Sequence, residues 1–187
     1  ASSSSVYGIK EEKNVSEDMS LEPLTDYSKF KANCEKILNN YADDNFVVST
    51  IRPATVCGYA PRQRLDVIVN ILTNHAYHKK EIQIFGGSQL RPNIHIEDMA
   101  RAYLVLIKAD KKKINREIFN IGSTNHSVKE IAEKVKNNIG KDVKLTQIKS
   151  DDIRSYHISS KKIFEKLGFK TELTIEAVSY THLTLPT

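Results

Sequence analysis

The sequence predicts an α/β protein with a largely parallel sheet. Segments with helical apolar spacing alternate along the chain with short, β-branched apolar runs, and this alternation is typical of parallel strands joined by helices. Of the 187 residues, 40% are hydrophobic and 27% are charged, with a net charge of +5. These proportions are those of an ordinary globular chain and exclude a disordered or fibrous protein.

The predicted elements alternate in type from one end of the chain to the other. They are a helix over residues 24–41, a strand over 46–51, a helix over 64–78, a strand over 82–85, a helix from about 97 to 109, a strand over 117–121, a helix over 128–139, a strand over 143–148 and a helix over 160–167. No internal repeat or low-complexity linker interrupts this order.

Local patterns justify these elements. Residues 46–51 are mostly β-branched or apolar, as expected for a buried parallel strand. In the helix over 64–78, the apolar residues share one face. The pair Gly86-Gly87 forms a turn that ends the strand over 82–85. Ser127 and Glu130 have the spacing of a capping box, and Gly140 ends the helix that they begin.

Several functional classes are disfavoured. The longest apolar run, residues 102–107, is far short of the roughly 20 residues of a membrane helix. Cys34 and Cys57 lack metal-binding spacing, so we interpret them as reduced thiols of a cytoplasmic protein without a bound metal. The basic cluster of Lys108 and residues 111–113 is expected at a helix end, where cations are favoured, rather than on nucleic acid.

The two ends of the sequence are unusual. Residues 1–5 carry neither the charged start nor the apolar segment of a signal peptide. Periodicity stops near Val178, and we interpret residues 179–187 as a non-native tail.

Tyr27 and Lys31 are the first candidate catalytic pair. They are four residues apart and therefore share one face of the first predicted helix. A cation beside a phenol stabilises the phenolate, so such a tyrosine can act as a general acid or base near neutral pH. The spacing taken alone also fits an ordinary surface pair on an amphipathic helix.

The surrounding motifs give this pair a context. Ser3 lies 24 residues before Tyr27, and an Arg-Pro-Ala-Thr-Val-Cys-Gly segment follows over residues 52–58. Further segments over residues 86–100, 119–122 and 152–169 keep the same order. Together they resemble the extended short-chain dehydrogenase/reductase family, which includes the NAD-dependent nucleotide-sugar epimerases and dehydratases. The resemblance extends over nearly the whole chain as far as Val178.

The resemblance implies a particular architecture. It predicts the second half of a Rossmann-type doubly wound parallel sheet plus a small α/β substrate-binding domain. Residues 1–60 would be the last part of the NAD-binding domain. Residues 61–178 would form mainly the substrate domain, with segments that return to the Rossmann sheet.

The resemblance also assigns catalytic and cofactor roles. Tyr27 would be the catalytic acid/base, Lys31 would hold the nicotinamide ribose hydroxyls, and Ser3 would hydrogen-bond the substrate oxygen that is oxidised. Ser3 has an alternative role as a loop cap. Four residues would lie beside the nicotinamide: Pro53, Ala54, Thr55 and Val56.

Substrate-binding residues follow from the same resemblance. Arg91 would grip the substrate diphosphate, since a planar, always-charged guanidinium suits two phosphate oxygens. Further positions are expected along the nucleotide-sugar pocket: Ser3, Ser4, Thr55, Asn70, Arg154 and Tyr156.

Four residues with reactive side chains are expected to be structural instead. Arg52 is expected to pair with an acid inside the fold, and His95 and Asp98 to lie at a helix entrance, where an acid interacts favourably with the helix dipole. Cys57 is expected to fill apolar space.

Two departures from the family pattern affect the interpretation. The seven glycines never form the glycine-rich dinucleotide fingerprint, so we expect this chain to be the carboxyl-terminal portion of its parent and inactive alone. Ser4 and Ser5 stand where the 4,6-dehydratases have Asp and Glu, and this disfavours elimination of water.

The predicted function is that of an NAD-dependent nucleotide-sugar epimerase that acts by transient hydride transfer. An NAD- or NADP-dependent reductase of the same family and a non-catalytic nucleotide-binding relative are the alternatives. The expected partners are a nucleotide-diphosphate sugar and, by analogy with relatives, a second copy of the chain. No membrane or nucleic-acid partner is expected.

Overall fold

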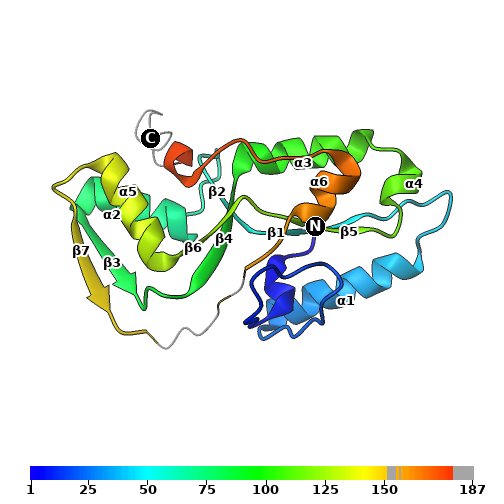
Figure 1. Ribbon diagram of the computed structural model, residues 1–187, viewed down its shortest axis with the longest axis horizontal. Helices are drawn as coiled ribbons and strands as arrows, with labels where there is room; N and C mark the ends of the chain where they lie inside the picture. Colours follow the sequence, from blue (N-terminus) through cyan, green and yellow to red (C-terminus); the bar gives the residue numbers. More distant parts are fainter. Residues whose placement is uncertain (151–154, 156, 179–187) are drawn as a thin grey trace.

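The computed structural model describes residues 1–150, 155 and 157–178 (Figure 1). The helices are η1 (Ser4–Tyr7), α1 (Asp26–Asn40), α2 (Ile68–Lys79), α3 (Ile96–Lys108), α4 (Lys111–Ile114), α5 (Val128–Ile139) and α6 (Lys161–Leu167). The strands are β1 (Thr50–Pro53), β2 (Thr55–Cys57), β3 (Glu81–Phe85), β4 (Leu90–His95), β5 (Ile118–Ile121), β6 (Thr124–Ser127) and β7 (Lys144–Ile148).

Most strand pairs in the described part of the chain are parallel. Strand β1 pairs with β5, β2 with β4, and β3 with β7, all in parallel, while β4 and β6 are antiparallel. The α/β class and the parallel strands predicted from the sequence are therefore confirmed.

Two hydrophobic clusters support these strands. The first gathers side chains from η1, α1, α3 and α6 around β1 and β5, with Tyr7 and Phe119 fully buried. The second packs α2 and α5 against β3, with Val69 and Ile131 fully buried. In Figure 1 the elements of the two clusters occupy opposite halves of the molecule, and β2 and β4 lie between them. Polar side chains from both halves line the junction between them.

Strand β1 is displaced from its predicted position. The sequence predicts residues 46–51, but the strand starts only at Thr50. Before it, the backbone N–H groups of Asn45 and Phe46 donate to Asp43 Oδ1, each at 2.7 Å, and the Val48 N–H donates to Asn115 Oδ1 at 3.1 Å. These side-chain bonds occupy the donors that a ladder would need, so a turn replaces the first part of the strand.

Strands β2, β4 and β6 were not predicted. Pro92 interrupts β4 and removes one donor from the ladder, which hides the strand in the sequence pattern. Strand β6 consists of four polar residues, Thr124 to Ser127. The capping box that follows it is confirmed, because the Glu130 N–H donates to Ser127 Oγ at 3.2 Å and the Ser127 N–H donates to Glu130 Oε2 at 2.7 Å.

Candidate active site

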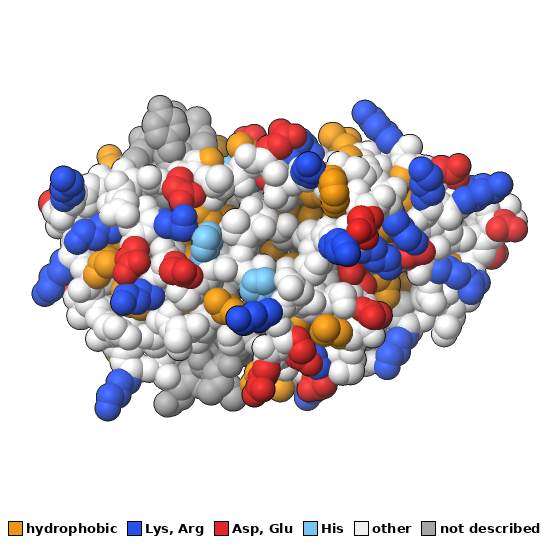
Figure 2. Space-filling view, viewed as in Figure 1, with side chains coloured by type: hydrophobic (Ala, Val, Ile, Leu, Met, Phe, Trp, Pro, Cys, Tyr) orange, Lys and Arg blue, Asp and Glu red, His pale blue; other side chains and the backbone are white. Residues whose placement is uncertain are grey.

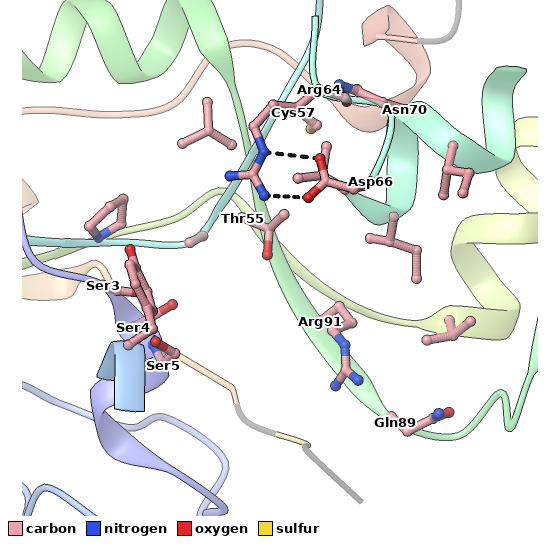
Figure 3. Close-up of a pocket in the computed structure, with 18 of the residues that line it drawn as sticks. Ser3, Ser4, Ser5, Thr55, Cys57, Arg64, Asp66, Asn70, Gln89 and Arg91 are labelled. Carbon is pink, nitrogen blue, oxygen red and sulfur yellow. Dashed lines mark hydrogen bonds and ion pairs between the residues drawn. The ribbon is translucent and has the colours of Figure 1, made fainter. Parts of the chain in front are cut away.

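A cleft of about 870 Å³ lies at the junction of the two halves. Figure 3 shows residues 3–5 on one side of it, Arg91 and Gln89 on the other, and Thr55 between them. The cleft brings together most residues that the sequence analysis singled out. They are Ser3, Ser4, Tyr27, Pro53, Ala54, Thr55, Val56, Asn70 and Arg91.

Ser3 begins the helical turn η1. Its Oγ accepts a hydrogen bond from the Ser5 N–H at 3.2 Å and lies 2.9 Å from Ser5 Oγ. The turn ends at Gly8, whose φ of 73° is a conformation that residues other than glycine rarely adopt. A Cβ there would also lie 2.1 Å from the Glu22 carbonyl oxygen, so no side chain fits. Ser3 therefore caps this turn and also faces the cleft.

Tyr27 and Lys31 lie on α1. The Tyr27 side chain lines the cleft and is 58% exposed. The Lys31 ammonium lies 5.7 Å from the centre of the Tyr27 ring and donates a hydrogen bond to the Ala1 carbonyl oxygen at 3.0 Å. Lys31 is thus beside Tyr27 but is not among the described residues that line the cleft.

Thr55 and Arg91 come from the neighbouring strands β2 and β4, which are paired in parallel. Cations predominate among the charged side chains of the cleft. Of the described residues that line it, Arg62, Arg64 and Arg91 are cationic and Asp66 is the only carboxylate. Arg64 and Asp66 form a two-pronged ion pair, with Nε–Oδ1 and Nη2–Oδ2 distances of 3.0 and 2.6 Å (Figure 3). This balance suits an anionic ligand.

Asn70 is buried at the start of α2 and closes the loop before the helix. Its Oδ1 accepts the Gly58 N–H at 3.0 Å, and its Nδ2 donates to the Arg64 carbonyl oxygen at 2.8 Å. The helix predicted from residue 64 begins at Ile68 for this reason, because residues 59–66 instead form a loop held by Asn70. The Asn70 amide is thus bonded to backbone groups, and both Asn70 and the loop that it holds line the cleft.

The expectations for Arg52 and Cys57 are confirmed. Arg52 forms a buried, two-pronged ion pair with Glu35 of α1. Burial raises the pKa of the Cys57 thiol to about 12, so this side chain is a neutral, apolar filler at physiological pH.

His95 and Asp98 are likewise structural, as expected. His95 Nδ1 accepts the Glu97 N–H at 3.2 Å and thereby caps α3, and burial lowers the pKa of the ring, which favours this neutral form. Asp98 is fully buried and accepts the Leu173 N–H at 2.9 Å, in addition to its ion pair with Arg101.

Some lining residues were not predicted. Gln89 holds the Gly86-Gly87 turn, because its Oε1 accepts the Gly87 N–H at 2.6 Å and its Nε2 donates to the Phe85 carbonyl oxygen at 3.0 Å. Arg62 and Arg64 also face the cleft. Their positions depend on the Asn70-closed loop, which no local sequence pattern reveals.

Arg154, Tyr156 and residues 179–187 lie outside the described residues. Within the part of the chain that is described, no group of three or more His, Cys, Asp or Glu side chains could hold a metal ion. No helix there is both long and apolar enough to cross a membrane. On the face in Figure 2, Lys and Arg side chains alternate with Asp and Glu instead of forming one basic patch.

Comparisons with known proteins agree with this fold. Residues 1–122 match the model of the NAD dependent epimerase/dehydratase family. The chain belongs to this family. It is 36% identical over 124 residues to the uncharacterized UDP-glucose epimerase YtcB of Bacillus subtilis, covering 65% of this chain and 38% of that protein.

Two further relatives match over nearly the whole chain. The UDP-glucose 4-epimerase of Lactobacillus helveticus is 29% identical and covers 91% of this chain, which spans 57% of that enzyme. The crystal structure of UDP-glucuronic acid 4-epimerase from Bacillus cereus, in complex with UDP-glucuronic acid and NAD, is 28% identical with a TM-score of 0.82, over 96% of this chain and 58% of that one. The chain therefore spans between about two fifths and three fifths of the length of these relatives.

The chemistry of the described lining residues suits the nicotinamide end of an NAD molecule. Ser3, Tyr27 and the segment over residues 53–56 supply hydroxyl and backbone groups that can surround a nicotinamide and its ribose. A site for the pyrophosphate normally needs a glycine-rich turn that opens a helix. The sequence holds no such turn, and Gly86-Gly87 leads from β3 to β4 instead.

Proposed function

We propose that this chain forms the catalytic and substrate-binding part of an NAD-dependent nucleotide-sugar epimerase, with Ser3, Tyr27 and Lys31 as the catalytic set. The observation that carries the proposal is the cleft itself. It gathers Ser3 from the amino-terminal segment, Tyr27 from α1 and Arg91 from β4, which are distant in the sequence. Their combination suits a sugar hydroxyl at one end and a diphosphate at the other.

Each side chain has a defined task in this proposal. Tyr27 takes the proton from a sugar hydroxyl and later returns it, and the Lys31 cation lies beside its ring. Ser3 Oγ donates a hydrogen bond to the same sugar oxygen. Arg91 holds the diphosphate. NAD, when bound, supplies the reversible hydride transfer.

The cleft favours epimerisation over dehydration. Elimination of water needs an acid and a base beside the sugar carbons. Besides Tyr27, the described lining residues offer one carboxylate, that of Asp66. That carboxylate is bonded to Arg64. Ser5 Oγ, next to Ser3, lies 2.9 Å from Ser3 Oγ and carries no charge. The Lactobacillus helveticus and Bacillus cereus relatives are both named as 4-epimerases.

The test uses the full natural protein that contains this chain, supplied with UDP-glucose or UDP-glucuronic acid and NAD. Product epimers are measured by chromatography, together with any net formation or consumption of NADH. We expect an epimer without net NADH change. Tyr27→Phe should lower kcat by roughly 100-fold, the usual scale for loss of a general acid or base.

Tyr41→Phe provides the matched control, since Tyr41 is an exposed tyrosine at the end of the same helix and does not line the cleft. Its turnover should equal that of the parent. Undiminished turnover by Tyr27→Phe would refute the assignment. Stoichiometric NADH consumption would identify a reductase instead.

A further inference from the structure

A buried ion pair between Arg52 and Glu35 is bonded to Ser2, the residue before the proposed catalytic Ser3. Arg52 on β1 is 2% exposed and Glu35 on α1 is 7% exposed. Arg52 Nε lies 3.0 Å from Glu35 Oε1, and Arg52 Nη2 lies 2.7 Å from Glu35 Oε2. Burial opposes the charged form of Arg52, but its bonds to Glu35 and Tyr7 outweigh that effect and raise its pKa. The pair fixes α1 to β1.

The pair also holds both ends of the segment that contains Ser3. On one side, Ser2 Oγ donates a hydrogen bond to Glu35 Oε1, and the Ser2 N–H donates to the Ile51 carbonyl oxygen at 2.7 Å. On the other side, Arg52 Nη1 donates to the Tyr7 hydroxyl at 2.8 Å. Ser3 thus lies between two residues that are bonded to the same ion pair.

A hydrogen bond extends the network to a further strand. The Tyr7 hydroxyl donates to Asn120 Oδ1 at 2.7 Å, and Asn120 belongs to β5. Segments η1, α1, β1 and β5 are therefore joined by one buried network of hydrogen bonds. Such an arrangement is expensive to desolvate and is weak evidence for stability by itself, but it defines a unique geometry.

The spacing along α1 connects this network to Tyr27. Tyr27, Lys31 and Glu35 are separated by four residues each and so follow one stripe of the helix. Glu35 is about 12 Å along the axis from Tyr27, at 1.5 Å per residue. Anchoring Glu35 fixes the rotation and the axial position of the helix that presents Tyr27 and Lys31.

We propose that Arg52 and Glu35 are positioning residues that set Ser3 at its working distance from Tyr27. The inference rests on the proposed function, because it concerns the same catalytic groups. A displacement of the order of 1 Å between such groups can cost about 10²-fold in rate. The pair acts on catalysis through Ser2 and Tyr7, without touching the substrate.

The test removes single links and leaves the ion pair in place. In the full natural protein, Ser2→Ala deletes the bond to Glu35, and Tyr7→Phe deletes the hydroxyl between Arg52 and Asn120. Each variant should lower kcat about tenfold. This loss is smaller than the roughly 10²-fold expected for a displacement of about 1 Å, because each variant removes only one of the bonds that hold Ser3 in place. The KM for the nucleotide sugar should stay within about twofold, since the diphosphate is held by Arg91 elsewhere in the cleft.

Asp98→Asn is the matched structural control. It weakens the ion pair between the buried Asp98 and the partly exposed Arg101, and Asp98 does not line the cleft. Its melting temperature should fall while kcat remains near the parental value. Glu35→Gln leaves Arg52 buried without a counter-ion, so its kcat is informative only if the variant melts cooperatively; Ser2→Ala and Tyr7→Phe keep the inference testable in either case.

A double-mutant cycle separates positioning from general destabilisation. In a Ser3→Ala background, Ser2→Ala should cause no further loss of kcat, because the group that it positions is gone. An equal loss in both backgrounds would overturn the inference, as would parental kcat in both single-link variants. If Ser3→Ala and Tyr27→Phe also turn over at the parental rate, the proposed function itself fails, and this outcome is distinct from the other two.

Discussion

Arg91 offers a residue-scale test of substrate binding that is independent of the catalytic step. Its guanidinium lines the cleft from β4, across from Ser3 (Figure 3). A charge-assisted hydrogen bond contributes roughly 1.5–3 kcal/mol. Arg91→Ala should therefore raise the KM for a nucleotide sugar by about 10- to 100-fold while changing NAD affinity little. Steady-state kinetics and calorimetry measure the two quantities.

Lys108→Ala makes the same change in net charge at an exposed site at the end of α3, away from the cleft. It should leave KM unchanged. Equal substrate affinity in the Arg91→Ala and parental proteins would remove Arg91 from the binding site.

Single residues differ in how far the sequence predicts their role. Arg52 is an example of success, because a buried arginine requires a counter-charge and the fold supplies Glu35. The sequence does not say which acid this is, because only the fold shows which strand the helix meets. Asn70 illustrates the opposite case, since its bonds to Gly58 and Arg64 depend on a loop conformation that has no sequence pattern.

At the scale of elements, periodic segments were predicted well and segments defined by tertiary bonds were not. Helices α1 and α5 match their predicted ranges to within two residues at each end, because their caps and apolar faces are local properties. Strands β2, β4 and β6 were missed because their pairing in one three-stranded sheet, not their composition, makes them strands. The start of α2 was displaced by the loop that Asn70 closes.

This loop yields an element-scale prediction. In the full natural protein, Asn70→Ala should lower the free energy of unfolding by about 1–3 kcal/mol, because it leaves the buried Gly58 N–H without its acceptor. It should also raise the KM for the nucleotide sugar, since Arg62 and Arg64 on this loop line the cleft. Urea denaturation and steady-state kinetics provide the measurements.

Asn74→Ala controls for the loss of an asparagine from the same helix, because Asn74 lies one turn further along α2 and is only partly buried. Its unfolding free energy and KM should remain close to the parental values. If both asparagine variants behave alike, the loop is held by contacts other than the Asn70 amide.

At the scale of the whole molecule, the cleft lies where two separately packed clusters meet. Ser3 and Tyr27 come from the half that contains β1 and β5, while Asn70 comes from the half that contains α2 and α5. The spacing of apolar residues predicts which face of each helix or strand is buried. It does not predict how the two clusters are placed relative to each other. Only family order indicated that these residues share one site, and the structure supplies the cleft that they line.

We expect the 187-residue chain alone neither to bind NAD tightly nor to unfold cooperatively. Its nicotinamide-facing groups have no accompanying glycine-rich turn, and pyrophosphate binding depends on the amides of such a turn. In addition, β5 is the only strand that pairs with β1 among the described residues, so no strand covers its other edge, and Phe30 and Phe46 are 66% and 52% exposed.

Thermal melts with and without millimolar NAD test this prediction. A ligand that binds the folded state at about 100 times its Kd adds about 2.7 kcal/mol of stability, so tight binding would shift the transition visibly upward. We expect a broad transition that NAD does not move. Joining the chain to an amino-terminal glycine-rich half of roughly 110–130 residues, which brings it to a usual size for such an enzyme, should sharpen the transition and make it respond to NAD. A sharp, NAD-shifted melt of the 187-residue chain by itself would instead show that its own residues form a complete dinucleotide site.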